Sequence, residues 1–208
     1  MFIASCGSGS GSAGGGKKIA KNDFLGDLPN LIYQKNLIDS IRNAEEKAAT
    51  AKLNPNEKSD REKAVKISDK FKARKQAENE KYDANVEKIK AELVGKSIPF
   101  EVEEGTGYEI TYCKISDVQG RTIYVEFEVK ITDVKTAEIS RYGKPEVFVM
   151  AQSIDKNGNQ IGADGGYNID ITDRADGATG KDNRLIAISQ KYVEKYADFA
   201  KFRFIKNK

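Results

Sequence analysis

The spacing of the apolar residues changes once along this chain, at Gly95. Before this glycine, apolar residues recur every three or four positions with charged residues between them, the pattern of an amphipathic helix. After it, apolar and polar residues alternate, the pattern of a strand with one buried face. Because neither pattern suits the other element, we expect an α+β chain, with helices in residues 28–95 and strands in residues 96–208.

The helical part contains one break, at Pro55, and therefore predicts two helices that form a hairpin, the second ending at Gly95. Residues 72–81 are almost wholly polar and predict a solvated stalk. A coiled-coil oligomer is the alternative, but Arg74 and Glu78 fall on its expected apolar seam, so we favour pairing within one chain and a monomer. The apolar positions that define the two helices are Leu31, Ile38, Ile41, Ala44 and Ala48, then Ala64, Ile67, Phe71, Tyr82, Val86, Ile89 and Leu93.

The second part of the chain contains seven strand-like segments separated by turn signals. They span residues 98–103, 108–116, 121–131, 146–154, 166–172, 184–189 and 201–206. This number in about 110 residues resembles an antiparallel immunoglobulin-like β-sandwich. The segments 146–154 and 184–189 are apolar on both faces, as central strands would be. In 121–131, Ile123 and Phe127 are expected inside, and Tyr124 and Glu126 outside.

Missing residue types exclude several kinds of chemistry. The chain has no histidine and two cysteines, Cys6 and Cys113, so a zinc site or a Cys/His nucleophile cannot be assembled. We therefore expect no enzyme, no cofactor and no metal; a carboxylate-pair hydrolase is the remaining catalytic alternative, and it needs two carboxylates about 5–10 Å apart. The net charge of +3 is spread over both parts, which argues against nucleic acid as a partner.

The N-terminal segment Ile3-Ala4-Ser5-Cys6 resembles the lipobox of bacterial lipoproteins, followed by the run GSGSGSAGGG. The resemblance implies that Cys6 carries the lipid anchor and that residues 1–5 are a signal-peptide remnant. Residues 6–27 are then expected to be the lipidated cysteine and a flexible tether. Gly7 stands where inner-membrane retention commonly uses Asp, which favours an outer-membrane location. The alternative is a protein without an anchor that contains this motif by chance.

Residues 164–182 form an acidic, glycine-rich stretch after the fourth strand-like segment. Clustered carboxylates can bind Ca²⁺, and loops at the end of a sandwich commonly bind ligands. Asp and Gly are also the usual residues of an ordinary exposed loop. The candidate ligand-binding residues are Asp164, Asp170, Asp173, Asp176 and Asp182.

Smaller features have plainer interpretations. The run beginning at Asp155 resembles the start of a calcium loop, but its spacing fails later, and Asn157-Gly158 predicts a tight hairpin turn. Tyr108 and Tyr112 are expected on one face of a strand beside the polar face of residues 121–131. Cys113 is expected to be a small core residue.

Together these patterns predict a lipid-anchored cell-envelope protein that acts as a non-catalytic binding or scaffolding module. Its expected partners are the membrane, through Cys6, and an envelope protein or glycan. The alternative function is a surface module that binds carbohydrate or calcium through residues 164–182.

Overall fold

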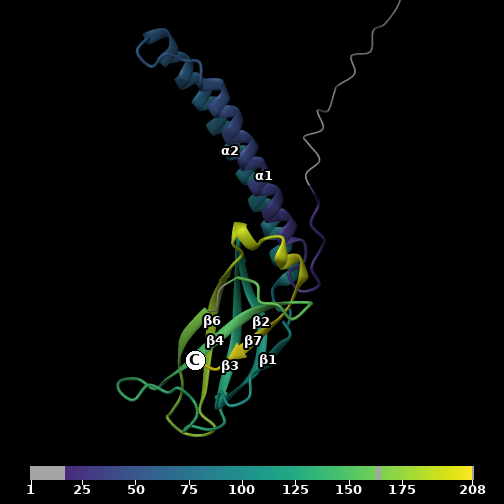
Figure 1. Ribbon diagram of the computed structural model, residues 1–208, viewed down its shortest axis with the longest axis vertical. Helices are drawn as coiled ribbons and strands as arrows, with labels where there is room; N and C mark the ends of the chain where they lie inside the picture. The colour runs from purple at the N-terminus through teal and green to yellow at the C-terminus, as the bar shows by residue number, and fades with distance from the viewer. Residues whose placement is uncertain (1–16, 163–164, 208) are drawn as a thin grey trace, which may run out of the picture.

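The computed structural model describes residues 17–162 and 165–207 and shows an elongated α+β molecule (Figure 1). Two helices precede seven strands, which form two sheets. The order of elements is the predicted one, helices before strands. The expected signal-peptide remnant at residues 1–5, Cys6 and the glycine-rich run lie outside the described residues.

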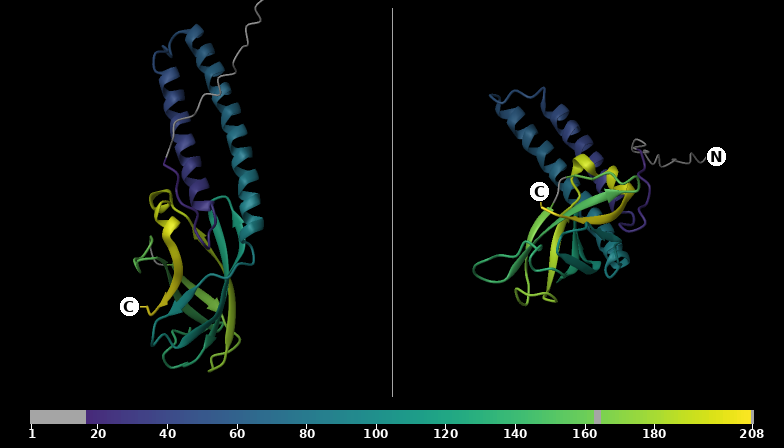
Figure 2. Two further views of the ribbon diagram at one scale, coloured as in Figure 1. Left: turned by 90° about the vertical axis from the view of Figure 1, so that its right-hand side faces the viewer. Right: turned by 60° about the horizontal axis from the view of Figure 1, so that its bottom comes forward.

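The hairpin consists of α1 (Leu28–Thr50) and α2 (Lys58–Leu93), which lie side by side and rise from one end of the sheets (Figure 2). Pro29 occupies the first turn of α1, where its missing N–H costs no hydrogen bond. After α2 the chain turns at Gly95, whose φ of +88° is accessible to glycine. The predicted helices and the end of the second one are confirmed. With 36 residues, α2 is about 54 Å long.

The root of the hairpin, defined as the buried apolar residues of α1 and α2, belongs to the same core as the sheets. Leu28, Ile32 and Leu93 are 0% exposed. The other members of the root are Val86 and Ile89. Because one continuous core includes both parts, the base of the hairpin is fixed to the sheets rather than hinged on a linker.

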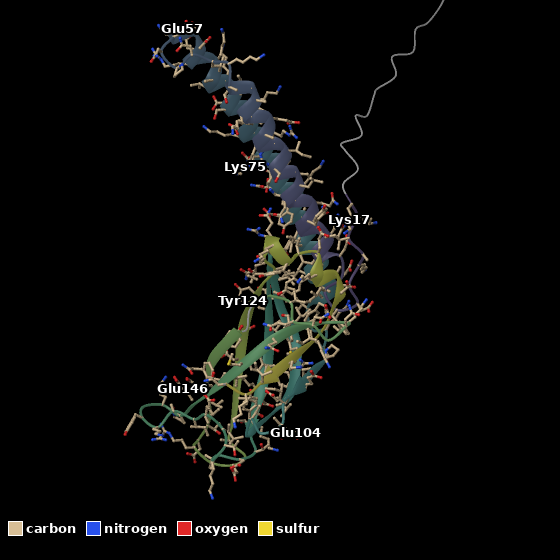
Figure 3. The ribbon with its side chains drawn as sticks, viewed as in Figure 1. Lys17, Glu57, Lys75, Glu104, Tyr124 and Glu146 are labelled. Atoms are coloured by element: carbon tan, nitrogen blue, oxygen red, sulfur yellow. The ribbon has the colours of Figure 1, made fainter. Side chains whose placement is uncertain are left out.

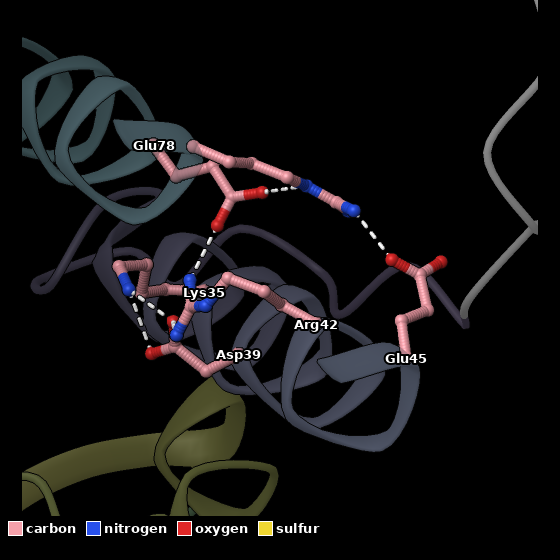
Figure 4. Close-up of polar contacts among 6 residues, drawn as sticks. Lys35, Asp39, Arg42, Glu45 and Glu78 are labelled. Atoms are coloured by element: carbon pink, nitrogen blue, oxygen red, sulfur yellow. Dashed lines mark hydrogen bonds and ion pairs between the residues drawn. The ribbon is translucent and has the colours of Figure 1, made fainter. Parts of the chain in front are cut away.

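An ionic cluster joins the helices further along, formed by Lys35, Asp39, Arg42, Glu45, Arg74 and Glu78 (Figure 4). Arg42 bridges the helices: its guanidinium lies 2.6 Å from Asp39 on its own helix and pairs with Glu78 on the other. Arg74 pairs across the hairpin with Glu45 and lies 2.8 Å from Glu78. Beyond this cluster, no residue of the range 43–75, here called the outer hairpin, is buried. None of residues 72–81 is buried either, so the solvated stalk expected there is confirmed.

Residues 17–27 differ from the predicted tether, because they pack on the folded part. Ile19 and Leu25 are 4% and 3% exposed, and the backbone N–H of Ile19 donates to Asn30 of α1 at 3.1 Å. The buried Asn22 amide donates to the carbonyl oxygens of Ala197 and Phe199 at 2.9 and 2.8 Å. The sequence KNDF looks like linker, yet Asn22 satisfies buried carbonyls and so holds this segment in place. Within the described part, the tether expected over residues 6–27 therefore does not extend beyond residue 16.

The two sheets have the strand orders β1-β7-β4-β5 and β2-β3-β6. Their bounds are β1 Phe100–Val102, β2 Tyr108–Gln119, β3 Thr122–Ile131, β4 Glu146–Asp155, β5 Gly165–Asp170, β6 Thr179–Ala187 and β7 Phe199–Ile205. An immunoglobulin-like arrangement is not confirmed: such domains pair their first two strands in one sheet, whereas here β1 pairs with β7 in parallel. The central strand expected at residues 184–189 belongs to β6, which is an edge strand, whereas β4 is central as predicted.

The sheets are linked at both edges. At one edge, the chain before β1 bonds to β2, with the N–H of Ile98 donating to Cys113 at 2.9 Å. At the other edge, the N–H of Thr172, after β5, donates to Thr179 of β6 at 2.9 Å. The core lies between the sheets, where the rings of Phe127 and Phe204 are 5.4 Å apart. Two short 3₁₀ helices, Gln190–Tyr192 and Lys195–Asp198, lie between the sheets and the base of α1.

Candidate functional site

The outer surface of the β2-β3-β6 sheet is a polar face built by strict alternation. In β3 the inward residues are Ile123, Val125, Phe127, Val129 and Ile131, all at most 3% exposed. The alternate residues of β3 are half-buried or exposed on the other side. The predicted division of this strand into an apolar and a polar side is confirmed. The polar side is therefore available to solvent and to ligands.

Ion pairs cross this polar face between neighbouring strands. Lys130 of β3 lies 3.0 Å from Glu109 of β2. Lys114 of β2 lies 3.1 Å from Glu126 of β3, and Lys181 of β6 lies 3.6 Å from Glu128 of β3. Three lysines thus balance three glutamates, since the register places opposite charges on adjacent strands.

Tyr112 lies at the centre of the polar face. Its hydroxyl donates to Glu126 at 2.5 Å, and the ammonium groups of Lys114 and Lys181 lie 5.1 and 5.7 Å from its ring centroid. The hydrogen bond to Glu126 raises the pKa of Tyr112 to about 12. The same bond, together with Lys114, lowers the pKa of Glu126. At neutral pH the phenol is therefore protonated and the carboxyl ionised.

Tyr108, expected on the same side as Tyr112, lies on the opposite one. It is 5% exposed in the core, and burial raises its pKa. The register of β2 against β3 shifts between Ile110 and Tyr112, as at a β-bulge. A bulge adds one residue to one strand and so reverses the side to which later residues point.

A groove of about 420 Å³ adjoins the polar face where β5 and β6 meet. It is open to solvent and offers carboxylate, ammonium and hydroxyl groups beside one apolar wall. Its lining residues are Glu128, Asp170, Ile171, Thr172, Thr179, Gly180 and Lys181. Glu128 and Lys181 belong to both the groove and the polar face, so the two form one continuous surface.

Gly180 permits the close approach of the two strands that form the groove. A Cβ at this position would overlap the carbonyl oxygen of Asp170 and lie 2.9 Å from a methyl carbon of Ile171. The backbone N–H of Thr179 donates to the hydroxyl of Thr172 at 3.2 Å. Sequence reasoning missed Gly180, because a glycine within an acidic, glycine-rich stretch looks like a turn residue.

The expected aspartate cluster is dispersed. Asp164 lies outside the described residues. Asp173 accepts a hydrogen bond from the N–H of Arg174 at 2.6 Å, and Asp176 accepts one from the N–H of Val134 at 2.7 Å. Both carboxylates thus fix the backbone of loops, as Asp commonly does in turns.

The remaining two aspartates lie on different strands. Asp170, at the end of β5, lines the groove and lies 3.9 Å from Lys144. Asp182 lies on β6, where its carboxylate accepts from the N–H of Asn183 at 2.6 Å. Across the residues that the structure describes, no group of three or more His, Cys, Asp or Glu is placed to hold a metal ion. Of the four expected aspartates that the structure describes, only Asp170 lines the groove.

The other predicted features have the expected structural roles. The N–H of Gly158 donates to the carbonyl of Asp155 at 3.0 Å, and Asn157 donates its N–H to the Asp155 carboxylate at 2.8 Å, which confirms the tight turn. Cys113 is 3% exposed, and burial raises the pKa of its thiol to about 12. It is therefore a core residue, as predicted.

Comparison with protein-family models, with curated proteins and with solved structures found no match to this chain. Neither helix in the described part of the chain has the length and apolar character needed to cross a membrane. The functional argument therefore depends on the groove, the polar face and the hairpin themselves.

Proposed function

We propose that this protein is a non-catalytic binding module of a bacterial cell envelope, anchored by lipid at Cys6. The observation that carries the proposal is the groove between β5 and β6, continuous with the polar face. It combines hydrogen-bonding groups with an apolar wall at Ile171, as sites for small polar ligands commonly do. The base of the hairpin is fixed to the sheets, because its root shares their core.

Binding without catalysis is supported by the protonation states beside the groove. A general acid or base works best when its pKa lies near the working pH. The hydrogen bond between Tyr112 and Glu126 moves both pKa values away from neutrality, the phenol upward and the carboxyl downward. Glu128 accepts a hydrogen bond from Thr111 at 2.6 Å and pairs with Lys181, so its carboxylate also interacts with two neighbouring side chains.

An envelope glycan is the ligand class that best suits the groove. Sugar hydroxyls can donate to Asp170 and Glu128 and exchange hydrogen bonds with Thr179. The alternative, calcium, has less support, because the described aspartates of residues 164–182 are dispersed.

Two separate measurements test the proposal. Metabolic labelling with an alkyne fatty acid, in bacterial cells expressing the chain behind a lipoprotein signal sequence, tests the anchor. We expect label on the unmodified protein and none on Cys6→Ser; equal labelling of both would contradict anchoring. Membrane fractionation of the same cells shows whether the labelled protein is in the outer membrane.

Amide chemical-shift mapping tests the groove. The probes are soluble muropeptides and core oligosaccharides of lipopolysaccharide, with Ca²⁺ as a separate titrant. We expect shifts at Thr172, Thr179 and Lys181 with one glycan class, and a weakening of at least fivefold in Thr179→Val. Thr122→Val, at the other end of the polar face, is the matched control. A lack of shifts in the groove at millimolar glycan would overturn the glycan proposal, and shifts with Ca²⁺ alone would replace it.

A further inference from the structure

We infer that the outer hairpin docks on a bilayer surface that contains anionic lipid headgroups. The inference starts from an uneven distribution of charge along the hairpin. The outer hairpin carries ten Lys or Arg against six Asp or Glu, whereas residues 28–42 and 76–95 carry five against six. Figure 3 shows Glu57 at the tip and Lys75 part of the way down, far from Glu104 and Glu146 at the opposite end of the molecule.

The charge of the outer hairpin is mostly unpaired. The ion pairs between two residues of this range are those of Glu45 with Arg74, of Asp60 with Lys63 at 2.8 Å, and of Asp69 with Lys72 at 3.7 Å. Three carboxylates remain outside ion pairs in this range, Glu46, Glu57 and Glu62. Six lysines remain outside them, namely Lys47, Lys52, Lys58, Lys66, Lys70 and Lys75. The surplus therefore consists of solvent-exposed ammonium groups.

The geometry gathers part of this surplus on one side of α2. Lys66 and Lys70 are four residues apart, which places these two unpaired lysines on one side of the helix. Val65 is 60% exposed in the same turn of α2 but lies on a different side of the helix from these lysines. Exposed lysines are attracted to the surface of an anionic bilayer.

The two arginines of the outer hairpin argue against nucleic acid as the partner that binds this surface. Arg61 donates to the backbone carbonyls of Pro55 and Asn56 at 3.2 and 3.3 Å, and Arg74 is held by Glu45 and Glu78. Planar, bidentate recognition of phosphate and bases is characteristic of Arg, and both arginines of the outer hairpin are already engaged. The unengaged lysines are point charges that suit a diffuse anionic surface.

A lipid anchor at Cys6 would hold the outer hairpin close to a bilayer surface, and this part of the inference rests on the proposed function. From Cys6 to Lys17 the chain spans at most about 38 Å. From there, Ile19 is bonded to Asn30 at the base of the hairpin. Because α2 is about 54 Å long, an arm inclined toward the bilayer brings its tip to the headgroups.

Vesicle co-sedimentation tests the inference without the anchor, using the full chain with Cys6→Ser. The probes are vesicles of phosphatidylcholine with 30% phosphatidylglycerol and vesicles of phosphatidylcholine alone, at about 0.15 M salt. We expect binding only to the anionic vesicles, because each Lys near an anionic surface contributes roughly fivefold in affinity. Failure of acylation at Cys6 would leave this result unchanged, so the two proposals fail separately.

A pair of quadruple variants locates the binding surface. Neutralising Lys58, Lys66, Lys70 and Lys75 to Gln is expected to weaken vesicle binding at least tenfold. The matched control neutralises Lys81, Lys88, Lys96 and Lys206, which lie outside the outer hairpin, and is expected to change affinity less than threefold. Equal losses in both variants, or no binding to anionic vesicles, would overturn the inference. Tighter binding to a DNA duplex than to the vesicles would also overturn it, in favour of a polymeric anion.

Discussion

The root of the hairpin and the ionic cluster above it hold the same two helices together by different forces. In the root, Leu28, Ile32 and Leu93 are 0% exposed. In the cluster, the side chain of Arg42 is 4% exposed, but that of its partner Asp39 is 34% exposed. Contacts between apolar side chains are neither screened by salt nor titrated, whereas ion pairs with access to water are screened and titrate.

This difference indicates that the local stability of the hairpin decreases from its root toward its tip. Residues in the shared core open only with the whole domain, while the helices beyond the cluster depend on a few partly exposed contacts. A fixed base with a softer outer part lets the outer lysines adapt to a surface while the groove stays in place. The predictions below test this gradient.

The largest expected effect is in the root. Ile32→Ala removes apolar contacts that belong to both the hairpin and the sheets, and should lower the free energy of unfolding by about 2–5 kcal/mol. Ile41→Ala, at a position 40% exposed on the same helix, should lower it by less than about 1 kcal/mol. Urea unfolding followed by circular dichroism measures both. Similar losses in the two variants would show that the root is no more important than the outer helix surface.

A smaller effect is expected in the ionic cluster. Arg42→Met keeps an unbranched apolar stem but removes the guanidinium, which leaves Asp39 and Glu78 without their shared cation. Removing one partner of a fully buried pair costs about 3–5 kcal/mol, but these carboxylates reach water, so we expect about 1–2 kcal/mol. Because the loss is local, it should appear as faster amide exchange in residues 39–50, with Ile32 unchanged.

Lys47→Met is the matched control for this variant. It removes one positive charge from the same helix at an exposed position outside the cluster. We expect its exchange pattern to equal that of the unmodified protein. If Lys47→Met and Arg42→Met accelerate exchange alike, the bridge to Glu78 contributes nothing and the comparison fails.

The sequence predicts what local pattern controls and misses what distant segments decide. The two helices, the sides of β3 and the turn at Gly158 follow from periodicity and turn chemistry, and each is confirmed. The pairing of β1 with β7 joins segments about 100 residues apart, and nothing within Phe100–Val102 specifies that partner. The immunoglobulin-like prediction rests on the number of strands, the turns between them and their one-sided or two-sided apolar patterns, none of which determines topology.

In the candidate site, too, some features follow from local sequence pattern and others depend on distant segments. Alternation predicts that Glu126 lies on the polar face. It does not predict that Tyr112 lies on this face while Tyr108 points into the core, because an irregularity in the register of β2 reverses the side to which later residues point. Gly180 and Asn22 have roles visible only in the fold, where one allows two strands to meet and the other satisfies buried carbonyls. The groove and the packing of residues 17–27 therefore were not predictable from local sequence.

The smallest expected effect is the response of the ionic cluster to acid. Burial alone would raise the pKa of Asp39, but hydrogen bonds from Lys35 and Arg42 outweigh it and lower that pKa below its usual range. A lowered pKa in the folded state stabilises it above the unfolded pKa of about 3.9, and this contribution is lost as the pH falls through the folded value.

Protection factors from amide exchange at pH 6 and pH 3 measure this loss. Residues 39–50 should lose protection corresponding to less than about 1 kcal/mol, because the carboxylate is partly exposed, while the root keeps its protection. In Asp39→Asn the same residues should start with lower protection at pH 6 and show a smaller change on acidification. An equal loss of protection in the root would mean that the helices open as one unit, and the gradient along the hairpin would then be wrong.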